Sequence, residues 1–143
     1  MIEIDVAKKL MKDCFYTCVL CKGDKLHISQ KSGVAPMMEF IEKGIDLKGF
    51  SVSDKVVGKA VALLFVLAGV TEVYAEVISK HAIAVLEKNN IAFSFEKEVD
   101  NIINRKGDGL CPMEEATLNI DDPKEAYEAI KAKLEFFKAQ KQG

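Results

Sequence analysis

An unbroken apolar run, AVALLFVLAGV at residues 60–70, constrains this chain more than any other feature. The run is much shorter than the roughly 20 residues that a membrane span needs. A helix that is apolar on every side is buried in a protein core. Ser53 upstream is a favourable N-cap and Gly69 is a favourable stop. The sequence therefore predicts a buried helix that begins at Ser53 and ends at Gly69.

The segments on both sides of this run alternate between helix and strand patterns. In the first half we expect a helix at 3–13, a hairpin with arms 15–21 and 26–29, and a short helix within 33–44 that has Pro36 in its first turn and ends before Gly44. In the second half we expect strands at 71–79 and 91–96 around a helix at 80–90, helical turns at 97–105, a short helix from Pro112, and a final helix after Asp122. Strands that alternate with helices imply right-handed crossovers onto one sheet. The fold class we predict is α/β, a single-domain three-layer α/β/α sandwich over residues 1–143, with a sheet made mixed by the hairpin.

Composition excludes several functional classes. The formal net charge is -2, and no basic tract stands out among the 20 lysines and arginines, so we expect no nucleic-acid partner. The start, MIEIDVAKKL, carries charges and no apolar signal region. The 4 cysteines are not paired in spacing, which favours a reducing compartment. We expect a cytoplasmic protein without a membrane partner, and a homo-oligomer stays open.

Two stretches, GVAPMMEFIEKGIDLKGFSVSDKVVGKA and NRKGDGLCPMEEA, resemble an uncharacterised prokaryotic family, domain of unknown function 1893. That family is associated with a cytidine-deaminase-like fold. The order hairpin, buried helix, strand, helix, strand, over roughly residues 3–96, is similar to the element order of that fold. The resemblance implies a cytidine-deaminase-like architecture and carries no assigned reaction.

The zinc chemistry of the deaminases can be compared with the residues present. A zinc deaminase needs His or Cys two residues before Glu at one helix start and Pro-Cys-x-x-Cys at the next. The corresponding stretches here, SVSDKVVGK and VISKHAIAV, lack this set. The only Cys-x-x-Cys runs from Cys18 to Cys21 in the hairpin, where side chains three residues apart point to opposite faces. We expect no metal site and infer no cofactor.

Polar residues gather before the apolar run. Ser53, Asp54, Lys55 and Lys59 stand at the predicted helix start, where free backbone N–H groups favour an anion. Two lysines oppose the helix dipole there. One interpretation is that Asp54 compensates them locally. The other is that a phosphate or carboxylate ligand binds to these residues, with Arg105 as a closing charge.

A lone cysteine marks the stretch GDGLCPMEEA at residues 107–116. Pro112 suits the first position of a helix, so Cys111 is predicted as its N-cap and Glu114 as the residue that returns a bond to the N-cap amide. A thiol at a helix start has a lowered pKa, which favours the nucleophilic thiolate. Its base would be His81 or Asp54. The alternative is a structurally inert cysteine in a glycine turn.

Three functional hypotheses follow for this uncharacterised protein. The first is a module that binds a small anionic ligand such as a nucleotide. The second is a zinc-independent enzyme with Cys111 as its nucleophile. The third is an interaction or oligomerisation protein without a pocket. They differ in whether the helix starts near residues 53 and 80 and the 104–115 loop converge on one cleft.

Overall fold

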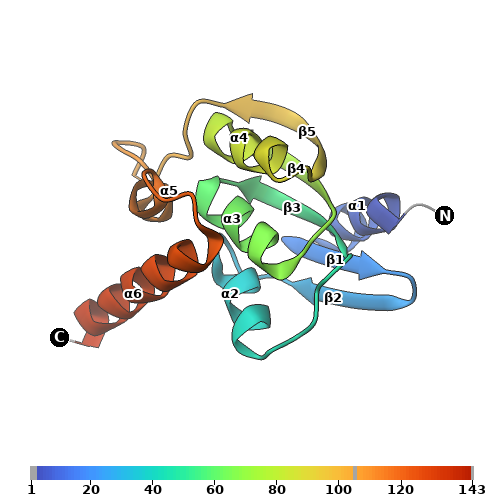
Figure 1. Ribbon diagram of the computed structural model, residues 1–143, viewed down its shortest axis with the longest axis horizontal. Coiled ribbons are helices and arrows are strands. Elements are labelled where there is room, and N and C mark those ends of the chain that lie inside the picture. The colour runs from blue at the N-terminus through green and yellow to red at the C-terminus, as the bar shows by residue number, and fades with distance from the viewer. Residues whose placement is uncertain (1–2, 105, 143) are drawn as a thin grey trace.

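The computed structural model describes residues 3–104 and 106–142 of the chain (Figure 1). Within these residues, six helices and five strands follow one another in a single α/β domain. Their order is α1 (Glu3–Cys14), β1 (Cys18–Lys22), β2 (Lys25–Ser29), α2 (Ala35–Glu42), β3 (Ser51–Val57), α3 (Lys59–Ala68), β4 (Glu72–Ser79), α4 (Lys80–Lys88), β5 (Ala92–Val99), α5 (Pro112–Thr117) and α6 (Pro123–Gln142).

The five strands form one mixed sheet in the order β2-β1-β3-β4-β5. β1 is antiparallel to both β2 and β3, whereas β3, β4 and β5 are parallel. The two-residue turn at Gly23 and Asp24 joins β1 to β2, and Gly23 has the positive φ of 59° that such a tight turn requires. α3 and α4 provide the crossovers between the parallel strands. The predicted mixed sheet is confirmed.

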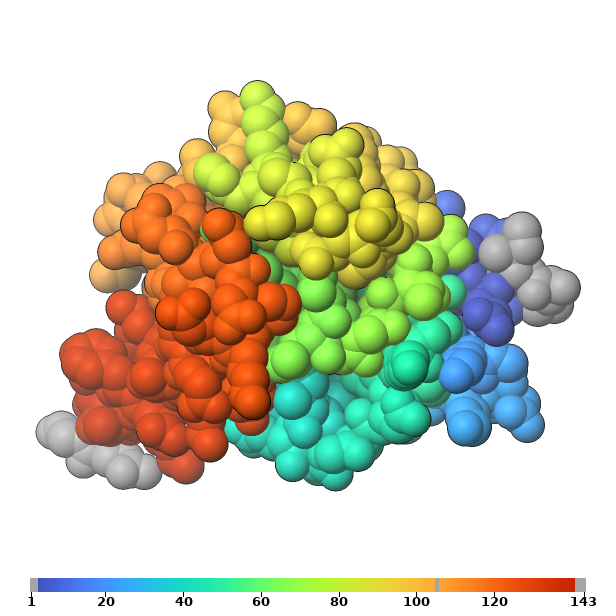
Figure 2. Space-filling model, viewed as in Figure 1, coloured from blue at the N-terminus to red at the C-terminus, as the bar shows by residue number. Residues whose placement is uncertain are grey.

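Helices cover both faces of the sheet, which gives the three predicted layers (Figure 1). α1 packs on β1, β3 and β4 on one face, over a small core that includes Ala7, Met11 and Tyr74. α2, α3, α4 and α6 lie on the other face, over the main core. Figure 2 shows that face, with α6 and α4 on either side of α3. α3 is buried from Lys59 to Phe65, as its sequence predicts, whereas Leu67 near its end is 38% exposed.

The predicted start of the buried helix is wrong. Ser53, Asp54 and Lys55 lie within β3, and α3 begins at Lys59 with Gly58 as its N-cap. β3 is an inner strand that pairs with β1 on one side and β4 on the other. These two ladders of backbone hydrogen bonds stabilise the strand more than Ser53 would stabilise a helix start. The sequence did not show this, because a short apolar run does not by itself distinguish a buried strand from a helix.

A second difference lies after β5. The segment 97–105 was expected to form helical turns, but β5 extends to Val99 and an isolated bridge then pairs Ile103 with Leu110. Alternation of Phe93 and Phe95 with polar residues is the pattern of a strand. The alternation ends at the charged residues Glu96, Lys97 and Glu98, but the strand continues through them because β5 stays paired with β4 up to Val99. The expected cap of the last helix is confirmed, since the N–H of Glu125 donates to Asp122 Oδ2 at 3.0 Å.

Candidate functional site

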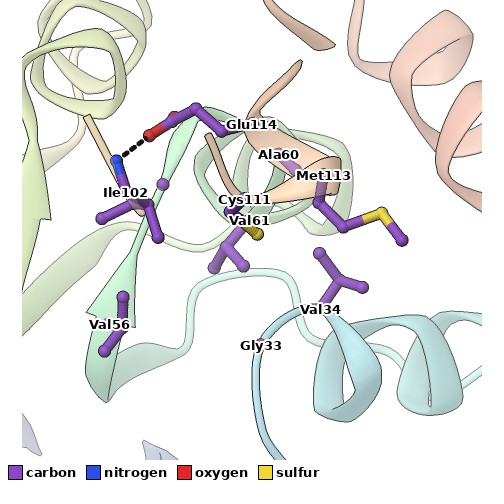
Figure 3. A pocket seen from close by; sticks show the side chains of 10 residues that line it. Gly33, Val34, Val56, Ala60, Val61, Ile102, Cys111, Met113 and Glu114 are labelled. Carbon is purple, nitrogen blue, oxygen red and sulfur yellow. Dashed lines mark hydrogen bonds between the residues drawn. The ribbon is translucent and has the colours of Figure 1, made fainter. Parts of the chain in front are cut away.

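A buried carboxylate joins the starts of two helices. Glu114 Oε1 accepts a hydrogen bond from the backbone N–H of Lys59 at 2.7 Å and from the hydroxyl of Ser79 at 3.2 Å. Glu114 Oε2 accepts one from the N–H of Ile102 at 2.6 Å (Figure 3). The Glu114 residue is only 1% exposed. A carboxylate of the chain itself therefore occupies the anion position at the start of α3.

Residues at the starts of both helices make room for the Glu114 carboxylate and bind it. Gly58 leaves the space that the carboxylate fills, because a Cβ there would lie 3.2 Å from Glu114 Oε1 and 3.0 Å from Ile102 Cγ1. Ser79 is the N-cap of α4, and its hydroxyl accepts a bond from the N–H of Ala82 at 3.2 Å while it donates to Glu114. The two helix starts are thus capped together.

The predicted bond between Glu114 and the N-cap amide of its own helix is wrong. Cys111 is the N-cap of α5, as expected, but its N–H donates to the carbonyl of Ile102 at 2.8 Å. This backbone bond brings the loop back against the end of β5. It leaves Glu114 free to point into the body of the protein, toward Lys59.

Lys59 and His81, both predicted site residues, line one hollow together with Lys88. The hollow has a volume of about 130 Å³ and is completed by Ala84, Val85 and Asp121. Lys59 is 7% exposed, and its Nζ donates to the carbonyl of Leu118 at 2.8 Å and pairs with Asp121 Oδ1 at 3.3 Å. His81 Nε2 lies 2.9 Å from Asn101 Oδ1.

Lys88 was not predicted as a member of this group. His81, Ala84, Val85 and Lys88 follow the spacing of one helix face, so their common surface was visible in the pattern of α4. What the sequence did not show is that Lys59 faces them from α3.

Cys111 lies between two other depressions. One is a small apolar cavity of about 60 Å³, which Val34, Val56 and Val61 also line (Figure 3). The second is an open groove whose remaining lining residues are Ile103, Asn104, Lys106, Asp108, Pro112, Met113 and Phe137. His81 lines neither of these two depressions.

The remaining predicted residues do not join Lys59 at the helix start. Asp54 is buried on the α3 side of the sheet opposite Cys18 of β1, and burial raises the pKa of its carboxyl well above the usual range. Ser53 donates to Met11 Sδ at 3.4 Å on the α1 side, and Lys55 is exposed. Arg105 lies outside the described residues.

Residues 3–104 and 106–142 contain neither a metal-binding cluster nor a membrane-spanning helix. Among residues 3–104 and 106–142, no three His, Cys, Asp or Glu side chains come together in a way that could hold a metal ion. Cys18 and Cys21 belong to the cores on opposite faces of the sheet, which confirms the prediction from their spacing. No helix in the same residues is long and apolar enough to cross a membrane.

Comparison with known proteins places these features in a family. The family model DUF1893, a domain of unknown function, matches residues 6–134. The crystal structure of a DUF1893 family protein from Thermotoga maritima is 27% identical, with a TM-score of 0.84 over 92% of this chain and 89% of that chain. No curated protein matches. The cytidine-deaminase-like assignment stays a prediction. The chain belongs to the DUF1893 family.

Proposed function

We propose that this protein binds a small ligand through a phosphate or carboxylate group, in the hollow between the start of α3 and the exposed face of α4. The observation that carries the proposal is that Lys59 and Lys88 face the same space as His81. Each lysine supplies positive charge and hydrogen-bond donors, and His81 can add a further donor. This is the anionic ligand expected from the sequence, held by a partly different set of residues.

The size and charge of the hollow define what it accepts. The hollow has a volume of about 130 Å³, and we expect it to take the anionic group of a ligand. Asp121 opposes the lysines, but its side chain is 73% exposed, and an ion pair so open to water contributes little. Lys59 is nearly buried, so its attraction for an anion is screened less than that of a surface lysine.

The test is a titration with inorganic phosphate, followed by amide chemical shifts at low and high salt. We expect saturable shifts at Lys59, His81 and Lys88 that weaken as salt rises. Lys88→Met should weaken binding about fivefold, which corresponds to about 1 kcal/mol of Coulomb attraction in water. The matched control is Lys80→Met, on the same helix, because Lys80 pairs with Asp100 and does not line the hollow.

Two results would refute the proposal. One is a titration with no saturable shift at these amides. The other is an equal loss of affinity in Lys80→Met, which would mean that phosphate responds only to the overall charge of the protein.

The expected cytoplasmic location has separate support. Cys14, Cys18, Cys21 and Cys111 are all free thiols in the structure. Free thiols are the rule in reducing compartments, whereas secreted proteins more often pair them. Location by cell fractionation would test this part of the proposal.

A further inference from the structure

β2 is an edge strand whose outer side is unpaired. In the described chain it pairs with β1 alone. The tight turn makes Lys22 and Lys25 the closing hydrogen-bonded pair of the hairpin, and bonding to β1 then alternates along β2. The carbonyl of Ser29 also accepts a bond from the N–H of Thr17, next to β1, at 2.9 Å, so it points toward β1 as the alternation requires.

The residues whose backbone hydrogen-bonding groups point away from β1 are consequently Leu26 and Ile28. Their backbone N–H and C=O groups face outward from the sheet, and neither residue forms a backbone bond outside the β1–β2 ladder in the described residues. Their side chains are also among the exposed large hydrophobic groups of the protein, at 45% and 40%. Free backbone groups and exposed apolar side chains thus occur at the same two positions.

The two edges of the sheet differ in their protection. Natural edge strands are commonly guarded by charged side chains that discourage pairing. β5, at the other edge, carries Glu96, Lys97 and Glu98 in succession. β2 has the sequence KLHIS, with its single lysine at one end. The β2 edge is therefore the one that is open to a further strand.

We propose that β2 pairs antiparallel with β2 of a second copy of this chain, about a two-fold axis centred on His27. In this register Leu26 of each copy lies opposite Ile28 of the other, so the free backbone groups form hydrogen-bonded pairs. The four aliphatic side chains then gather on one face of the joined sheet. Two five-stranded sheets become one continuous sheet.

Charge favours this arrangement over a parallel one. Lys25 lies opposite Ser29 of the other copy, and the two Lys25 residues are four positions apart, about 13 Å at the rise of a strand. That separation exceeds the Debye length of about 8–10 Å at physiological ionic strength. A parallel pairing in register would instead place the two lysines side by side. β2 of a second copy is thus complementary to β2 both in hydrogen bonding and in charge.

Sedimentation equilibrium of the full chain across a range of concentrations tests the proposal. We expect reversible dimers, and we expect Ile28→Lys to raise the dimer dissociation constant at least tenfold while the circular dichroism spectrum stays unchanged. The matched control is Phe95→Lys on β5, where Phe95 is 39% exposed, and this variant should dimerise like the unaltered chain. A chain that stays monomeric at all concentrations, or dimers lost in Phe95→Lys and kept in Ile28→Lys, would overturn the proposal.

A covalent trap tests the register. Residues 27 of the two copies form the central pair without hydrogen bonds, where Cα atoms lie about 4.5 Å apart, close enough for a disulfide. His27→Cys should therefore yield a disulfide-linked dimer under mild oxidation, mapped by mass spectrometry to position 27. A dimer that persists without this cross-link would mean that another surface joins the copies.

Discussion

Glu114 and Lys59 lie 55 positions apart in the sequence and are joined by a hydrogen bond of 2.7 Å between the carboxylate and the N–H of Lys59, the first residue of α3. The negative end of this bond meets the positive end of the helix dipole. The same carboxylate also accepts from Ser79 and Ile102. One side chain therefore connects α5 with α3, α4 and the end of the β5 segment.

Replacing Glu114 by alanine should destabilise the fold strongly. The donors at Lys59, Ser79 and Ile102 would lose their common acceptor, and a buried unsatisfied group costs about 1–3 kcal/mol. We expect a loss of about 3–5 kcal/mol in urea unfolding, in the range for breaking a buried charged network. The control is Glu115→Ala, because Glu115 is the exposed neighbour on the same helix. Similar losses in the two variants would contradict a connecting role for Glu114.

Gly58→Ala tests the space around this carboxylate. The added methyl would lie within 3.0 Å of the Ile102 side chain and 3.2 Å of Glu114 Oε1, so one of them must shift. Overpacking of this kind costs about 1–3 kcal/mol. In Gly109→Ala the added group meets only Asn104 Nδ2 at the ordinary distance of 3.7 Å, and we expect almost no change. Thermal unfolding of both variants measures the difference, and equal melting temperatures would rule out the close approach.

Asp54 should make stability fall as pH rises. Burial raises the pKa of its carboxyl in the folded state, so folding favours the protonated form. The stabilising effect is complete below the unfolded pKa of about 3.9 and is lost as pH rises through the folded pKa, by up to about 1.4 kcal/mol per pH unit. Asp54→Asn removes this dependence, so the variant should gain stability relative to the unaltered chain between pH 4 and pH 7. Urea unfolding at several pH values measures that difference.

Asp100 gives a control of opposite sign. Its hydrogen bond with Lys80 lowers the pKa of the Asp100 carboxyl, so its contribution is present above the unfolded pKa and is lost as pH falls. Asp100→Asn should therefore lose stability relative to the unaltered chain at neutral pH and not in acid. The same trend in both variants would mean that Asp54 is not protonated on folding.

The four cysteines should separate into two classes in alkylation of the native protein. Cys14 is exposed and Cys111 is partly exposed, whereas Cys18 and Cys21 are buried and burial raises the pKa of both thiols. Limiting iodoacetamide should therefore label Cys14 and Cys111, and the other two only after unfolding. Mass-spectrometric mapping at several pH values measures the rates. Faster labelling of Cys111 than of the more exposed Cys14 would support its activation at a helix start, and slower labelling would favour the inert alternative.

The sequence predicted the layered architecture because its signals are local and repetitive. The glycine turn defines the hairpin, the apolar run defines α3, and Asp122 begins α6. The N-cap of α3 was misplaced by five residues, since it is Gly58 and not Ser53. Ser53 and Asp54 are typical capping residues, yet they lie in an inner strand where Met11 and Cys18 are their neighbours from other elements.

The site was less accessible to sequence reasoning because its contacts are long-range. Glu114 satisfied a local capping pattern, but in the structure it bonds to residues of α3, α4 and the segment after β5. Lys59 and His81 were each identified as candidates, and only the crossover geometry places them beside one hollow. Cys111 and His81 were predicted as partners, and they line different hollows.

The joint cap of α3 and α4 comes late in the chain, so it becomes available late in synthesis. Synthesis proceeds from the N-terminus at about 5–20 residues per second, so Glu114 is added about 3–11 seconds after Lys59. By the end of that interval all five strands and both crossover helices have been synthesised, and the two helix starts still lack their shared acceptor. Synthesis of α5 therefore supplies the shared acceptor, and α6 then adds Ala126 and Ile130 to the main core. The helices that follow β5 thus close a domain whose sheet precedes them in the chain.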